Sequence, residues 1–154
     1  MLDFGIKPES AVSSPVLLQD DRSAFLTFNA ERLRADGMFE EAGTAIVEII
    51  GCSSTKFGYP NNEAIAGHPL YAKGLEAYDI FQVLNSSWDA EHAAQNLISF
   101  PNPRLSQSRP KHFIFTFHDS TFECLADEIK IEVSNEPYAQ IFRRISERFL
   151  KGSY

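Results

Sequence analysis

The chain has 154 residues, of which 44% are hydrophobic and 23% charged, a composition typical of one globular domain that buries a core without disulfides. Its formal net charge of −7 argues against binding to nucleic acid or anionic membranes, which requires clustered Lys and Arg. No apolar run reaches the ~20 residues of a membrane span, no signal-peptide pattern opens the chain, and two cysteines are too few for a disulfide framework. These features predict a soluble, acidic, cytoplasmic protein.

The first third of the chain predicts a lead-in followed by a β-hairpin. Residues 1–22 contain two prolines and are expected to be loosely ordered, with one short strand at 16–18. The alternating SAFLTFN (23–29) predicts a strand, and GTAIVEIIGC (43–52), apolar on both faces, predicts a central strand. Residues 31–41 between them predict a splayed hairpin end or a short helical turn.

Residues 53–74 form the longest irregular stretch. The sequence SSTKFGYPNNEAIAGHPLYAKG is dense in Gly, Pro and Asn, which excludes regular structure over most of it. Long loops in compact domains are often functional. The aromatic side chains of Phe57, Tyr59 and Tyr71 predict that this loop packs against the rest of the domain.

A strand and a helix are expected next. Residues 77–84, AYDIFQVL, predict the strand. In the following NSSW, the hydroxyl of Ser86 or Ser87 can cap a helix that we expect to end near Leu97. Prolines at 101, 103 and 110 then predict a polar loop.

In the stretch HFIFTFHDSTFEC, residues 112–124, Phe recurs at 113, 115, 117 and 122, with mostly polar residues between. Side chains alternate between the two faces of a strand, so this pattern predicts a hairpin with a Phe face and a polar outer face. Burying one Phe contributes on the order of 1.5–3 kcal/mol, and the Phe face is therefore expected in the core. A four-residue loop at 118–121 would pair Phe115 with Cys124 and Thr116 with Glu123.

Two further elements complete the fold. Residues 128–133, EIKIEV, predict a strand with one solvent-exposed face, and residues 138–150 predict an amphipathic C-terminal helix. We expect this helix to cover the Phe face. Together the elements predict an α+β fold for a single domain of residues 1–154, with one antiparallel sheet of about five to six strands and two helices packed on one face.

The polar outer face of the hairpin has two interpretations. It is either a solvated sheet surface or a shallow polar pocket that the 53–74 loop closes with aromatic side chains. In the second case it would be a binding site. The residues expected to line that site are Tyr59, Asn61, His68, Thr116, His118, Asp119, Thr121 and Glu123.

No spacing in the sequence demands catalysis, a cofactor or a metal. His112 and His118 share a strand face, but six residues of strand separate them by roughly 20 Å, too far to bind one ion. Ser120 beside His118 and Asp119 has the residue types of a catalytic triad, yet neighbours in sequence do not make that geometry. Cys124 lies on the Phe face and is expected to be inert.

Three blocks within residues 57–126 carry a resemblance. FGYPNNEAIAGHPLY, VLNSSW and HFIFTFHDSTFECLAD resemble the same three blocks in a group of small bacterial proteins of unknown function. The resemblance implies a bacterial, soluble, single-domain protein. It implies no activity, cofactor or functional residue.

We therefore predict a binding or protein-interaction domain without independent enzymatic activity. Its surface would be the polar face of the hairpin with the 57–71 loop, and its partner a protein or a small polar ligand. The alternative is a small hydrolase or metal-dependent enzyme that uses His118, Asp119, Glu123 and His68. A third hypothesis is a structural homo-oligomer that buries the outer face between subunits.

Overall fold

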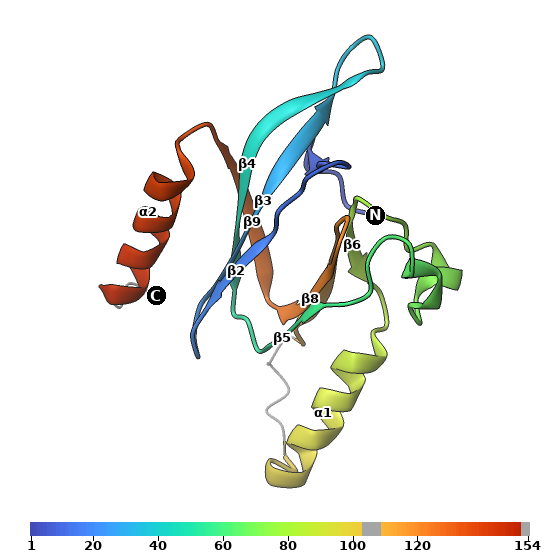
Figure 1. The fold of residues 1–154 in the computed structure, drawn as a ribbon. Coiled ribbons are helices and arrows are strands. Elements are labelled where there is room, and N and C mark those ends of the chain that lie inside the picture. The colour runs from blue at the N-terminus through green and yellow to red at the C-terminus, as the bar shows by residue number, and fades with distance from the viewer. Residues whose placement is uncertain (103–108, 152–154) are drawn as a thin grey trace.

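The computed structural model describes residues 1–102 and 109–151. Within these residues, nine strands and two α-helices form an α+β fold with two antiparallel sheets, one of five strands and one of four (Figure 1). The predicted α+β class is confirmed. The strands are divided between two sheets, where the sequence predicted one.

The five-stranded sheet is built around one long hairpin. Its strands are β1 (Lys7–Pro8), β2 (Val16–Gln19), β3 (Ala24–Leu33), β4 (Phe39–Ile50) and β9 (Glu128–Ser134). β3 pairs with β4, β4 pairs with β9, and both β1 and β2 pair with β3. Pairing continues beyond a β-bulge at Ala30/Glu31 as far as Leu33 and Phe39, so residues 31–41 form neither a splayed end nor a helical turn.

The four-stranded sheet contains the aromatic hairpin. Its order is β5 (Ser54–Gly58), β8 (Thr121–Ala126), β7 (Lys111–Thr116) and β6 (Ile80–Val83). Phe115 faces Phe122 and Thr116 faces Thr121, so the predicted register is wrong by two residues and the four-residue loop is 117–120. Because a shift of two residues preserves the alternation of faces, every side chain still lies on its predicted face.

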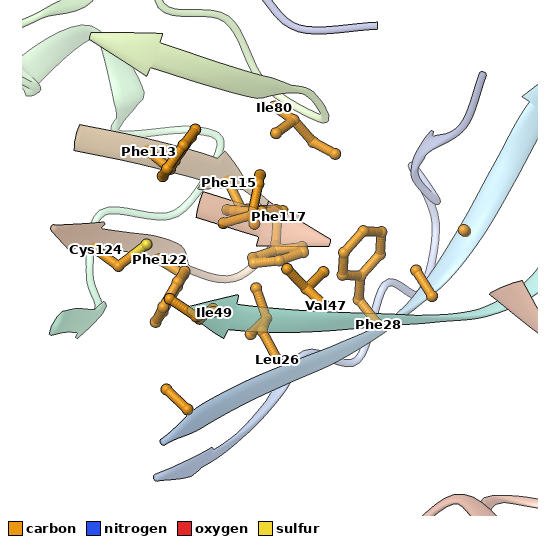
Figure 2. Packing of buried hydrophobic residues seen from close by; sticks show 14 of the residues in the cluster. Leu26, Phe28, Val47, Ile49, Ile80, Phe113, Phe115, Phe117, Phe122 and Cys124 are labelled. Carbon is orange, nitrogen blue, oxygen red and sulfur yellow. The ribbon is translucent and has the colours of Figure 1, made fainter. Parts of the chain in front are cut away.

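The core lies between the two sheets. Figure 2 shows the Phe face of β7 and β8 pointing toward side chains of β3 and β4. The Phe28 ring packs at 6.1 Å from Phe115 and 5.4 Å from Phe117, measured between ring centroids. The Phe face is therefore buried as predicted, but the five-stranded sheet covers it, and the prediction that the C-terminal helix does so is wrong.

The C-terminal helix α2 (Tyr138–Leu150) lies on the other side of the five-stranded sheet. Its Ile141 and Ile145 pack against Phe25 of β3 and Ile46 of β4. These two strands carry apolar side chains on both faces, so one face can pack on the second sheet while the other packs on a helix. This explains how a helix with the predicted apolar stripe covers a different surface from the one expected.

The first helix, α1 (Ser87–Ser99), starts at the outer face of the four-stranded sheet and then projects away from the domain (Figure 1). Its Trp88 is buried, and the Trp88 ring lies edge-on to His112 at 5.2 Å. The two helices therefore lie on opposite outer sides of the paired sheets, not on one face as predicted. The helix ends before Pro101 as expected, whereas Pro103 lies outside the described residues.

No helix in the described part of the chain is both long enough and apolar enough to span a membrane.

Candidate functional site

The long loop covers the outer face of the four-stranded sheet. It contains two short 3₁₀ helices, η1 (Ile65–Gly67) and η2 (Tyr71–Lys73). Ile65 and Leu75 pack against Phe81 and Ile114 of the sheet, and Ile114 is fully buried beneath them. The loop therefore covers this face, but through Ile65 and Leu75 and not through the expected aromatic side chains, since Tyr59 and Tyr71 are exposed.

Two histidine side chains meet at the carboxylate of Glu123. His112 Nε2 lies 2.8 Å from Glu123 Oε1, and His68 Nε2 lies 3.3 Å from Glu123 Oε2. His112 Nδ1 lies 2.8 Å from the hydroxyl of Ser86. We name these residues, His68, Ser86, His112 and Glu123, the Glu123 cluster. They come from the end of η1, the N-cap of α1, β7 and β8, so the cluster joins four elements.

The partners of each atom fix the direction of these hydrogen bonds. Leu70 N–H donates to His68 Nδ1 at 3.1 Å, so the neutral His68 ring carries its hydrogen on Nε2 and donates to Glu123. An ionised carboxylate only accepts, so His112 also donates from Nε2. In the neutral ring Nδ1 is then an acceptor and Ser86 O–H donates to it, while the Ser86 oxygen accepts from Asp89 N–H at 3.2 Å.

The surroundings keep Glu123 ionised. Burial acts to raise the pKa of Glu123, but the hydrogen bonds from His112 and His68 outweigh burial and hold that pKa below its usual value.

Trp88 packs against one side of the Glu123 cluster. Its ring lies between His112 and His92, and Lys56 Nζ lies 4.0 Å from the ring centroid.

A second group of polar side chains lies at the tip of the hairpin. Asn62 Nδ2 donates to the Tyr78 hydroxyl at 2.7 Å, and this hydroxyl lies 2.8 Å from His118 Nδ1. Asn62 N–H also donates to the carbonyl of His118 at 2.9 Å. The loop is therefore bound to the hairpin tip by both backbone and side-chain contacts. The His118 ring is partly exposed, and its Nε2 lies 3.9 Å from the exposed carboxylate of Asp119.

The structure places the eight residues predicted to line a site in four different environments. His68 and Glu123 meet in the Glu123 cluster, and His118 and Asp119 meet at the tip. The side chain of Thr116 bonds to the backbone of Glu76 and Asp79, and that of Thr121 to the backbone of Pro60. The side chain of Asn61 accepts from Ala64 N–H within the loop. Tyr59 is 81% exposed.

Sequence reasoning missed Ser86, His112 and Tyr78 as members of these groups. His112 was predictable, because the alternation that places Glu123 on the outer face places His112 there as well. Ser86 was identified only as a helix cap, a role it does have. Tyr78 gave no sequence signal, because its position depends on a backbone φ of 59° just before β6.

Within the described ranges, no group of three or more His, Cys, Asp and Glu side chains is arranged to hold a metal ion. Comparison with known proteins finds no matching family model, no matching curated protein and no matching solved structure.

Proposed function

We propose that the protein is a binding domain that recognises a protein partner through the 57–71 loop and the hairpin tip at 118–119. The role requires no bond to be broken. The observation that supports this proposal is a difference between the polar and the aromatic side chains of the loop. Its polar groups bond to the hairpin, whereas its aromatic side chains Tyr59 and Tyr71 are 81% and 47% exposed.

Such a loop suits recognition for a physical reason. Ordering a flexible loop on binding costs conformational entropy, and a loop already held by contacts to His118, Thr121 and Glu123 avoids most of that cost. Tyrosine adds a large apolar area with few rotatable bonds, and it is enriched among residues that dominate binding energy. Asp119 and the partly exposed His118 supply a polar rim beside this surface.

The partner class follows from charge and chemistry. A net charge of −7 disfavours nucleic acid and favours a partner with a neutral or basic surface. A small polar ligand and a second copy of the chain are the remaining partner types.

The thiols of Cys52 and Cys124 are both unpaired, which supports a reducing, cytoplasmic setting.

Site-specific photo-crosslinking tests this proposal. Benzoylphenylalanine placed at Tyr59 should give one dominant adduct in cell extract, whereas the same group at Leu150, which is 85% exposed on α2, should not. An adduct between two copies of the chain would identify the homo-oligomer instead. With the identified partner, Tyr59→Ala should raise the Kd roughly tenfold or more by calorimetry. Equal, unspecific adducts at Tyr59 and Leu150 would contradict the proposal.

A further inference from the structure

Three side chains of the Glu123 cluster are arranged as in a catalytic serine site. Ser86, His112 and Glu123 form a continuous line of hydrogen bonds, with 2.8 Å from the Ser86 hydroxyl to His112 Nδ1 and 2.8 Å from His112 Nε2 to Glu123. The hydroxyl donates to a ring nitrogen whose opposite nitrogen donates to a carboxylate. That polarity is the one a serine nucleophile needs, because the imidazole can accept the hydroxyl proton while the carboxylate stabilises the resulting imidazolium.

We propose that Ser86 is a nucleophile toward small carboxylic esters, with His112 as its general base and Glu123 as the residue that positions His112. His68 orients the other oxygen of Glu123 and is a positioning residue as well. These residues differ from the candidate catalytic residues considered from the sequence. His118 and Asp119 lie at the hairpin tip, outside this line of hydrogen bonds. It shares His68 with the 57–71 loop, but the proposed reaction needs no protein partner.

The reaction divides into two balanced halves. Ser86 Oγ forms a bond to the acyl carbon as its proton moves to His112 Nδ1, and the leaving alkoxide takes that proton and departs as an alcohol. A water molecule then attacks the acyl group on Ser86 and gives a proton to His112 Nδ1. The carboxylic acid leaves, and Ser86 Oγ recovers the proton. No oxidant, reductant or further reactant is consumed.

The burial of Ser86 limits the substrate class. Its exposed fraction is 8%, and the buried ring of Trp88 packs against His112 beside it. The neighbouring residues Leu84, Asn85 and Ser87 are exposed. A small acyl group such as acetyl can therefore approach more readily than a long or branched one.

Labelling with p-nitrophenyl acetate tests the proposal, with the acetylated residue located by peptide mass spectrometry. In the folded wild type we expect one acetyl group on Ser86 and faster reaction than with p-nitrophenyl butyrate. Ser86→Ala should abolish this labelling, and His112→Gln should slow it on the order of 10²-fold or more. Ser87→Ala is the matched control, because Ser87 is the neighbouring exposed serine, and its labelling should equal that of the wild type.

Two further measurements separate chemistry from structure. Glu123→Gln should slow labelling, since the imidazolium that His112 forms during the reaction loses the carboxylate that stabilises it. Wild type unfolded in urea should lose the preference for Ser86, which checks the role of geometry without any substitution. Acetylation of Ser86 no faster than that of Ser87, or equally fast in folded and unfolded protein, would overturn the proposal. Because the reagent needs no protein partner, this result is distinguishable from failure of the binding surface.

Discussion

Glu123 is the residue through which the long loop, the hairpin and the first helix are joined. Its two carboxylate oxygens accept from His68 of the loop and His112 of β7, and His112 accepts from Ser86 at the start of α1. Glu123→Gln replaces one acceptor oxygen by an NH₂ group that faces a ring N–H donor. We expect a loss of about 1–3 kcal/mol in the free energy of unfolding, measured by urea titration at pH 7.

The same carboxylate predicts a pH dependence of stability. Burial raises the pKa of Glu123, the two histidine bonds lower it more, and the net folded-state pKa lies below the value of 4.5 for an unperturbed Glu. Ionisation therefore stabilises the fold, fully above about pH 4.5, and this contribution disappears as the pH falls through the folded-state pKa. Urea titrations at several pH values should show the difference between wild type and Glu123→Gln narrowing below about pH 4.5. A difference that stays constant to pH 3 would contradict this assignment.

Thr116 offers a test that involves no charge. Its buried hydroxyl donates to the Glu76 carbonyl at 2.7 Å and accepts from Asp79 N–H at 2.9 Å. Thr116→Val keeps the shape but leaves both backbone groups unpaired, so we expect a loss of about 1–3 kcal/mol in thermal or urea unfolding. Thr55→Val, which removes a hydroxyl bonded to Gln19 at a less buried position, is the control and should cost clearly less.

At the scale of elements, the sheet-to-sheet packing makes the aromatic hairpin central to stability. Phe115 is fully buried and its ring contacts Phe28 of the other sheet and Phe122 of its own. We expect Phe115→Ala to lower the free energy of unfolding by about 3–5 kcal/mol. Phe57→Ala, on the same sheet but 45% exposed, should have a much smaller effect in the same urea titration.

The elements also define what the sequence could predict. The alternation in residues 112–126 correctly assigns each side chain to a face, because a misplaced Phe would cost several kcal/mol. The register was wrong by two residues, because pairing Phe115 with Phe122 or with Cys124 gives the same faces. Which surface α2 covers was not predictable in the same way, since both faces of β3 and β4 are apolar.

At the scale of the whole molecule, local patterns identify strands but not the sheet to which each belongs. The division into two sheets depends on pairings between distant segments, such as β4 with β9 and β5 with β8. The candidate sites depend on the same long-range packing. His68 and Glu123 were predicted to meet because both are polar groups on a face that a loop could cover, whereas Ser86 joins them only through the path from β6 into α1.

One ionised carboxylate, that of Glu123, holds two histidines in a fixed orientation between the loop and the sheet. Long-range ¹H–¹⁵N correlation spectra of the imidazole rings test it directly, near pH 8.5, well above the pKa of about 6.5 of a free imidazole. Both His68 and His112 should be Nε2–H tautomers, because Leu70 N–H and Ser86 O–H occupy their Nδ1 atoms. An Nδ1–H tautomer for either ring, or the averaged tautomers of a solvent-exposed histidine, would contradict the account.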